Sequence, residues 1–431
     1  MTATSAASAP TTGPTQTPPQ TTSVTPAVPQ KQRPTRSTPR QLQLLSTGAV
    51  VVGVLVGLVG ALTFAFLAYT LHRAQADATQ LIRVQKIQTD LLSADAAATN
   101  AFLVGGLEPA AQRAGYDSAV TDASSLIAEA ARAQPADATA LAALNTELVD
   151  YTASIEQARA NNRQGLPVGA QYLRLASAQL RSGALPVLDE LVSANTSRAA
   201  AGMHVGWGYL FPVVALLALA GFVVGQGWLA RRFHRRINPG LLVASVVLAV
   251  AVIAGLAGVA RLGGRVSDVR TGSFADLNAA ATSRTGAYNA KANESLTLIA
   301  RGSGSAFDQA WTSSAATVVQ QLTLLDDPSL TGNWTAYAKV HTAIRALDNG
   351  GNWDGAVARA TGSAPDSANL SFTTFDGALA SVLDSANART STALAGQTPG
   401  LVVAAVLALL AGLAAALLGR RGIAARLREY R

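Results

Sequence analysis

The chain has no cysteine, and this excludes several kinds of site before any motif is considered. Disulfides, thiolate nucleophiles and cysteine metal ligands are ruled out, so any folded domain must be stable through packing alone. Histidine is scarce as well: His72, His204, His234 and His341 are far apart in the sequence, and no pair has metal-ligand spacing. We therefore expect membrane-border or surface positions for these four side chains, and no metal or other cofactor.

Recognisable catalytic motifs are missing too. The sequence contains no phosphate-binding glycine loop, no Gly-x-Ser-x-Gly turn and no convincing pair of carboxylates. These absences predict a protein that is not an enzyme. A transporter is disfavoured because its membrane helices usually carry ionisable or helix-breaking residues at mid-membrane. Pro212 and Gln226 are the only such candidates in the second apolar stretch, and the fourth stretch has none.

Four long apolar stretches dominate the sequence instead, at roughly 48–70, 205–230, 241–262 and 400–418. Each has about 20 apolar residues or more, enough at ~1.5 Å per residue to cross a ~30 Å hydrocarbon core. Buried helices of soluble proteins can look similar, but four in one chain favour an integral membrane protein. The first stretch exceeds the apolar region of a signal peptide, which favours an uncleaved anchor over cleavage at Ala74-Gln75-Ala76.

The positions of the arginines predict the orientation. Arg231, Arg232, Arg235 and Arg236 fill the short turn between the second and third stretches, and Arg420 and Arg421 begin a basic segment after the fourth. Together with the basic residues before the first stretch they lie on one side, and such residues favour the cytoplasm. We expect a multi-pass plasma-membrane protein with both termini cytoplasmic, and these arginines are the candidates for contact with a cytoplasmic partner. Topology also explains the net charge of +8 without nucleic-acid binding.

The two polar segments between the stretches look like copies of one unit. Val187-Leu188-Asp189 recurs as Val382-Leu383-Asp384, 195 positions later, and the first and third stretches have about the same offset. The Gly165-x-x-x-Gly169 connection recurs at Gly351 with an offset of 186, so the second unit gains about nine residues afterwards. The segment 361–366 is the expected insertion.

Both polar segments have the apolar spacing of helices packed side by side, with steps of three and four residues. The apolar positions of the first segment lie within 84–98, 116–130 and 141–158, and those of the second within 311–325 and 337–347. A fourth helix from about residue 169 is expected to continue into the second apolar stretch, kinked at Pro186. The sequence therefore predicts an all-α protein with four transmembrane helices and two tandem extracytoplasmic up-down four-helix bundles.

These observations divide the chain into nine segments. They are a disordered Thr/Pro-rich cytoplasmic tail (1–46), a first span (47–70), a first bundle (71–204), a second span (205–230), an Arg-rich turn (231–240), a third span (241–262), a second bundle (263–399), a fourth span (400–418) and a basic tail (419–431).

One local pattern carries a family resemblance. The segment 95–109, Asp-Ala-Ala-Ala-Thr-Asn-Ala-Phe-Leu-Val-Gly-Gly-Leu-Glu-Pro, followed by Arg113 and Tyr116, resembles the first helix connection of CHASE3-like and chemoreceptor-type sensor domains. The segment 292–302 is a weaker echo in the second unit. This resemblance implies a four-helix-bundle sensor. Such sensors usually carry an output domain after their membrane helices. We expect none here, so any signal is expected to pass to a separate protein.

The whole layout resembles the actinobacterial GlnX-type membrane protein. That resemblance implies a solute-binding lipoprotein outside and a cytoplasmic Ser/Thr kinase as partners. The other expected partners are the lipid bilayer and a second copy of the chain in a homodimer. If a small anionic solute binds directly, Arg83, Lys86, Arg174 and Arg181 are the candidate cations, although they also fit solvated helix surfaces. The alternative function is a scaffold protein of the cell envelope that carries no signal.

Overall fold

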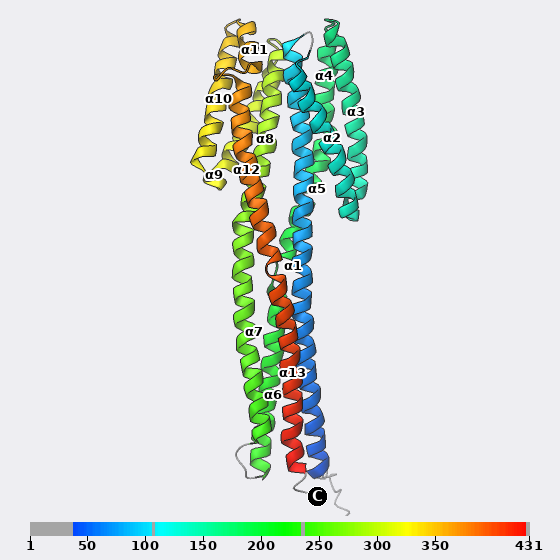
Figure 1. Ribbon diagram of the computed structural model, residues 1–431, viewed down its shortest axis with the longest axis vertical. Coiled ribbons are helices and arrows are strands. Elements are labelled where there is room, and N and C mark those ends of the chain that lie inside the picture. The colour runs from blue at the N-terminus through cyan, green and yellow to red at the C-terminus, as the bar shows by residue number, and fades with distance from the viewer. Residues whose placement is uncertain (1–37, 106–107, 234–237, 428–431) are drawn as a thin grey trace, which may run out of the picture.

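The computed structural model describes residues 38–105, 108–233 and 238–427, and every regular element in these ranges is a helix. The molecule is long and narrow, with four parallel or antiparallel helices at one end and two helix bundles side by side at the other (Figure 1). Four of the helical segments are long and apolar enough to cross a membrane. The predicted all-α fold with four spans is confirmed.

The helices in chain order are α1 (Thr38–Val104), α2 (Ala110–Ala133), α3 (Ala138–Arg163), α4 (Val168–Gln179), α5 (Leu185–Gly202), α6 (Leu210–Phe233), α7 (Pro239–Thr271), α8 (Ser273–Ile299), α9 (Ser305–Leu325), α10 (Pro328–Asn349), α11 (Trp353–Thr361), α12 (Ala368–Ala395) and α13 (Thr398–Leu427). Short 3-10 turns lie at Pro135–Asp137 and Gly206–Tyr209, and a π-turn lies at Leu180–Ala184.

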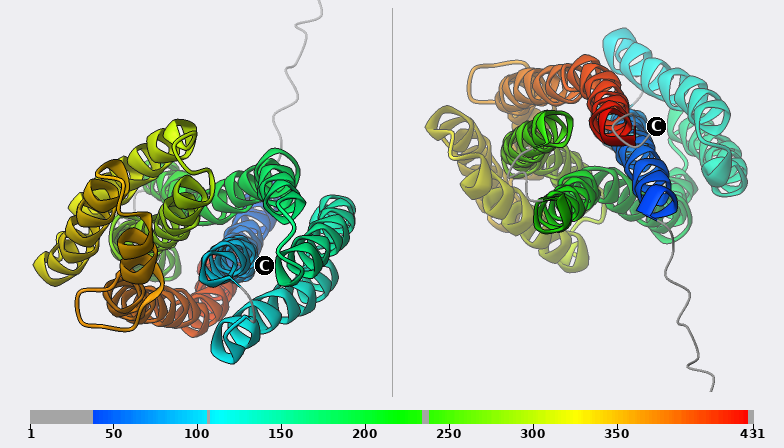
Figure 2. Two further views of the ribbon diagram at one scale, coloured as in Figure 1. Left: turned by 90° about the horizontal axis from the view of Figure 1, so that it is seen from above. Right: turned by 90° about the horizontal axis from the view of Figure 1, so that it is seen from below.

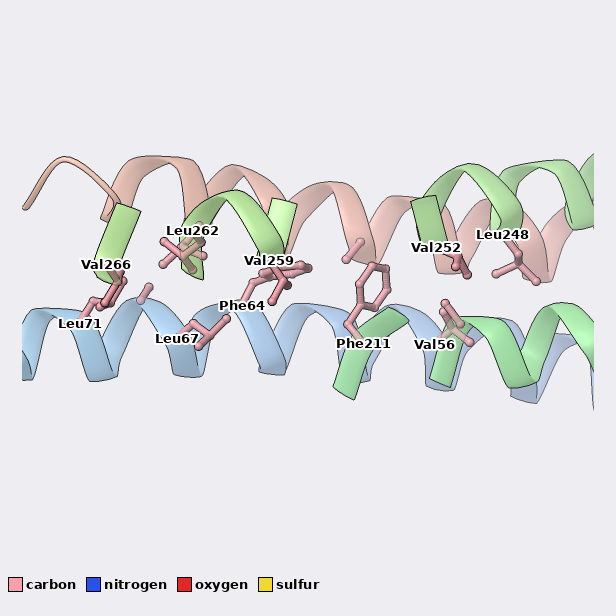
Figure 3. Packing of buried hydrophobic residues seen from close by; sticks show 14 of the residues in the cluster. Val56, Phe64, Leu67, Leu71, Phe211, Leu248, Val252, Val259, Leu262 and Val266 are labelled. Atoms are coloured by element: carbon pink, nitrogen blue, oxygen red, sulfur yellow. The ribbon is translucent and has the colours of Figure 1, made fainter. Parts of the chain in front are cut away.

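The membrane part is a four-helix group made of α6, α7, α13 and the first half of α1. Its core is apolar along the whole length, and Figure 3 shows side chains of α1, α6 and α7 meeting along its middle. Phe64 of α1 and Phe211 of α6 pack edge to face there, with ring centroids 5.4 Å apart. Large apolar side chains such as Leu62 and Ile253 point outwards instead, 68% exposed in each case, as expected for contact with lipid.

Helices α1 and α13 approach each other very closely, because small residues face one another. A Cβ on Gly53 would lie 2.6 Å from the backbone nitrogen of Ala416, and a Cβ on Gly412 would collide with the backbone of Gly57. Such small-residue contacts drive helix association in membranes, where the hydrophobic effect between helices is absent. This contact joins the first span to the last span.

The bundle that contains α2 and α3 is here called bundle 1. It consists of the second half of α1, then α2, α3, and α4 with α5. Its core confirms the predicted apolar spacing. The apolar residues spaced three and four apart within 84–98, 116–130 and 141–158 are buried, except that Val120 is only partly buried. Bundle 2 consists of α8, α9, α10, and α11 with α12. Figure 2 shows α1 on the side of bundle 1 that faces bundle 2, where it packs against α8.

One expectation about helix continuity is wrong. The last helix of bundle 1 does not continue into the second span: α5 ends at Gly202 and α6 begins at Leu210. Gly206 and Gly208 belong to the intervening 3-10 turn, where a Cβ on Gly208 would lie 3.0 Å from Val259. Glycine is poor in a helix interior, and here it also permits a close contact. The fourth helix of bundle 2 is interrupted at 362–367, which agrees with the insertion expected at 361–366.

Residues 38–46, assigned to the disordered tail, instead begin α1, because Leu42 is fully buried against the membrane core. At the other end of the chain α13 extends to Leu427, into the segment assigned to the basic tail. Residues 1–37 lie outside the described residues. Pro186 has no backbone N–H to donate within the helix. The π-turn Leu180–Ala184, just before it, accommodates this missing hydrogen bond, and the helix does not end there.

Candidate functional site

A cavity of about 290 Å³ lies at the membrane-distal end of bundle 1. Helix α1 provides its small and aromatic floor, α2 and the segment before it provide one wall, and α3 with α4 provides the other. The lining residues are Ala98, Ala101, Phe102, Glu108, Ala110, Arg113, Ile155, Ala158, Arg159, Asn162, Arg163 and Leu173. Three guanidinium groups and one carboxylate therefore surround an otherwise apolar space.

Among the charged residues of this cavity, Arg159 is held by both an ion pair and an aromatic contact. Its side chain is only 11% exposed, and its Nη2 lies 3.0 Å from Oε1 of Glu108. The guanidinium also stacks over the Tyr116 ring, 4.0 Å from the centroid, which is a cation–π contact. Burial raises the pKa of the Tyr116 hydroxyl above its ordinary value of 10, although the nearby Arg159 acts in the opposite direction.

Arg113 crosses from α2 to α3 on the outside of the same cavity. It pairs with Asp117 at 3.0 Å on its own helix and with Glu156 at 3.2 Å on α3. Arg159 also pairs with Glu156 at 2.9 Å, so three carboxylates, Glu108, Asp117 and Glu156, stand against the three guanidiniums of the cavity. A small solute with an anionic group and an apolar part would bind here by replacing one of these carboxylates at a guanidinium and by contacting Phe102 and Leu173.

The sequence pattern that carried the family resemblance covers one wall of this cavity, including Phe102, Glu108 and Arg113. Arg159 was missed, because it belongs to α3 and its partner Glu108 is 51 residues away in the chain. Only an expectation that α3 packs against the connection before α2 would have drawn attention to it.

The four cations predicted for ligand binding do not converge on one point. Arg181 pairs with Asp95 at 2.8 Å, and Asp95 is twelve residues, or ~18 Å of helix, beyond Arg83 on α1. Lys86 pairs with Asp90 at 2.9 Å on its own helix, and Arg174 donates to the Ala170 carbonyl at 3.3 Å. Arg83 is half-buried. A ligand-binding role for these four residues stays a prediction.

Arg181 instead links the two bundles. Its partner Asp95 is fully buried and also accepts a hydrogen bond of 2.5 Å from Ser177 of α4. The Nε of Arg181 donates to Asn289 of α8 at 3.1 Å, so one side chain joins α1 and α4 of bundle 1 to bundle 2. A second cross-link, from Gln85 to Asn278 at 3.1 Å, lies nearer the membrane.

A polar cluster at the membrane-proximal end of bundle 1 holds the α2–α3 connection. Asp137, only 2% exposed, accepts hydrogen bonds from Arg198 and Asn195 of α5 and from Gln80 of α1. The pKa of Asp137 is lowered: burial acts in the opposite direction, but these donors outweigh it. This cluster, here called the latch, ties the α2–α3 hairpin to the two helices that lead towards the membrane.

Bundle 2 contains a buried charge cluster that the sequence did not reveal. Glu294 is fully buried and lies 2.8 Å from Nζ of Lys291 and 3.0 Å from Nδ1 of His341. His341 also stacks on Trp311, with ring centroids 3.7 Å apart. The expected surface position of His341 is therefore wrong, because its carboxylate partner is 47 residues away in the chain and no local pattern joins them.

The arginines predicted to meet a cytoplasmic partner lie at the end of the molecule opposite the bundles (Figure 1). Arg231 and Arg232 end α6, Arg420 and Arg421 lie near the end of α13, and all four are exposed. Arg235, Arg236 and His234 lie outside the described residues. Their contact with a partner stays a prediction.

Across the described ranges, no group of three or more histidine, cysteine, aspartate or glutamate side chains could hold a metal ion. A family model described as an actinobacterial sensor domain matches residues 70–204, which is all of bundle 1 and roughly a third of the chain. Neither the search of curated proteins nor that of solved structures gave a match. The family match and the four apolar helices together fit a multi-pass membrane protein of the sensor type, and the cavity lies inside the matched segment.

Proposed function

We propose that this protein is a non-enzymatic sensor and signal transducer of the plasma membrane, with its bundles outside and both termini in the cytoplasm. Bundle 1 receives a small solute or a solute-binding protein and passes the signal to a separate cytoplasmic partner. A Ser/Thr kinase is the candidate partner that the layout suggests. The observation that carries the proposal is the sensor-family match over 70–204, the segment that contains the cavity.

The arrangement of helices supplies a route for the signal. One end of the α2–α3 hairpin borders the cavity and the other end is held by the latch, so a ligand that moves the hairpin pulls on α1 and α5. Helix α1 is 67 residues long and has no interruption between the cavity and the far end of the membrane group. A ligand can bias this assembly only by its different affinity for two arrangements of the hairpin.

The break between α5 and α6 makes α1 the more direct path. Helix α5 still follows α1, because a Cβ on Gly202 would lie 2.8 Å from Cβ of Ala74. From α1 the movement reaches α13 through the close contact at Gly57 and Gly412. The exposed arginines at the ends of α6 and α13 are the surface that a cytoplasmic partner would meet.

Hydrogen–deuterium exchange of the full chain in detergent, read by mass spectrometry, tests direct sensing. The probes are the twenty amino acids and short dicarboxylates such as succinate, added singly. A bound compound should slow exchange in 98–116 and 155–173, and also change exchange near the latch. Arg159→Gln should abolish both effects, whereas Arg132→Gln, an exposed arginine on α2 outside the cavity, should retain them.

Protection confined to the cavity, with no change at the latch or along α1, would contradict the transmission route. If no compound protects the cavity, a solute-binding protein is the remaining input. Cross-linking in native membranes should then recover such a protein outside and a kinase inside. Recovery of envelope-synthesis proteins alone would favour the scaffold function and overturn the proposal.

A further inference from the structure

The membrane part contains a second hollow, a groove of about 670 Å³ between α7 and α13. Its interior is apolar: Val250, Ala254 and Gly258 of α7 face Ala404 and Leu407 of α13. Phe64 and Phe211 close its inner side, and Figure 3 shows both rings between α1, α6 and α7. A space of this size is in the range that binds a small organic ligand.

The groove has its only charges at one end. Arg261 and Arg265 of α7 lie at the end that faces the bundles, opposite the start of α13. Arg265 donates a hydrogen bond of 3.3 Å to Oε1 of Gln397, which fixes its position at this rim. Both guanidiniums are exposed, and within the described residues neither forms an ion pair with a carboxylate.

The groove runs along the membrane helices from the end that faces the bundles. Its wall extends from Arg265 to Val246 on α7, ~28 Å of helix, and from Gly400 to Ala411 on α13, ~16 Å, against a ~30 Å hydrocarbon core. The apolar stretch of α7 ends at Leu262, so Arg261 and Arg265 lie at the depth where phospholipid headgroups begin. An apolar channel with cations at its headgroup end has the polarity pattern of a phospholipid.

We infer that this groove binds an anionic phospholipid of the bundle-side leaflet, with an acyl chain between α7 and α13 and the headgroup on Arg261 and Arg265. A neutral apolar partner would leave both guanidiniums without a counter-charge. A free anion would leave the apolar groove unfilled. The bound lipid touches α7 and α13 of the second unit and also Phe64 of α1, so it contacts both halves of the membrane group.

Two variants separate the headgroup contact from the chain contact. The double substitution Arg261→Gln with Arg265→Gln removes the two charges and leaves the groove open. Gly258→Leu fills the groove, and its side chain has room, because no atom lies within 4 Å of a Cβ at Gly258. The controls are Arg270→Gln, beyond the groove on the same helix, and Gly221→Leu, an equally open glycine on α6.

Native mass spectrometry of the purified full chain, with equimolar dioleoyl-phosphatidylglycerol and dioleoyl-phosphatidylcholine, measures the retained lipid. The wild type should retain one phosphatidylglycerol in preference to phosphatidylcholine. The double arginine variant should lose this preference by about fivefold for each charge removed, the effect of one cation near an anionic lipid surface. Gly258→Leu should lose retention of both lipids, and the two controls should behave as wild type.

Equal retention of the two lipids by the wild type would overturn the inference. So would unchanged retention in the double arginine variant, which leaves the packing of the groove intact and does not depend on how Gly258→Leu folds. Displacement of the lipid by inorganic phosphate would assign the arginines to a free anion. A dimer that Gly258→Leu dissociates would assign the groove to a second copy of the chain.

Discussion

Replacement of Glu294 by glutamine should strongly destabilise bundle 2, because it removes the carboxylate that pairs with a buried lysine. Lys291 has a side chain that is 5% exposed and a carboxylate oxygen 2.8 Å from its Nζ. In Glu294→Gln the remaining contacts of that ammonium are the Ala360 carbonyl at 3.4 Å and the Tyr337 ring at 5.8 Å. An unpaired buried charge of this kind costs about 3–5 kcal/mol.

The size of this effect converts into a change of melting temperature. Bundle 2 has about 120 residues, and an unfolding entropy of ~2.1 cal/mol/K per residue gives ~0.25 kcal/mol/K for the bundle. A loss of 3–5 kcal/mol then lowers its melting temperature by roughly 12–20 °C. Tryptophan fluorescence is a specific probe, because Trp311, Trp334 and Trp353 lie in bundle 2 and bundle 1 has none. Replacement of Trp207 and Trp228 by phenylalanine removes the signal of the membrane part.

The matched control is the double variant Glu294→Gln with Lys291→Met. This variant removes both members of the Lys291–Glu294 pair and leaves the other charges of the bundle in place. It should recover most of the lost stability, since a buried ion pair replaced as a whole is often nearly neutral. A double variant no more stable than Glu294→Gln would refute the electrostatic explanation and assign the loss to packing. A change of only one or two degrees in Glu294→Gln would refute it as well.

Acid titration gives a second test of the same cluster. Lys291 and His341 hold the pKa of Glu294 below its ordinary value of 4.5, although burial acts in the opposite direction. The folded state therefore binds fewer protons at this site than the unfolded state. The resulting stabilisation is complete above about pH 4.5 and is lost as the pH falls towards the folded-state pKa. Glu294→Gln should lose this acid-dependent component while the remaining pH dependence persists.

Two further substitutions test other parts of the structure. Gly412→Leu should prevent the close contact of α13 with Gly57 and lower both the yield and the melting temperature in detergent, and an unchanged melting temperature would contradict the packing described here. Asp137→Asn should weaken the latch by about 2–3 kcal/mol, the value of hydrogen bonds to a charged group. Amide exchange at 130–140 should then accelerate at neutral pH, and exchange equal to wild type would contradict a role for the Arg198 contact.

The apolar seams of bundle 1 were predictable from sequence because burial on a helix follows a local period. Ile87, Leu91 and Ala94 lie one turn apart, and all three are fully buried. The four spans were predictable for a similar reason, since a long uncharged apolar run has few alternatives to crossing a bilayer. Neither inference needed to know which helix lies next to which.

The helix ends were harder to predict. The Gly-rich segment before the second span looked compatible with a continuous helix, but the structure places a 3-10 turn there, and Gly208 packs on Leu67 and Val259. At Thr38 the opposite happens: the helix begins earlier than composition suggested, because Leu42 has a buried site to fill. Such ends depend on tertiary contacts that compete with intrinsic propensity.

The helical class, the four apolar spans and the buried apolar positions follow from the sequence alone, because each depends on residues within one helix. Which charged residues form pairs follows from the tertiary structure: Arg159 with Glu108, Asp137 with Arg198, and Glu294 with His341. Each pair joins segments that are remote in sequence. Its geometry follows from how those helices are rotated and shifted against each other, and no local period of apolar residues encodes this.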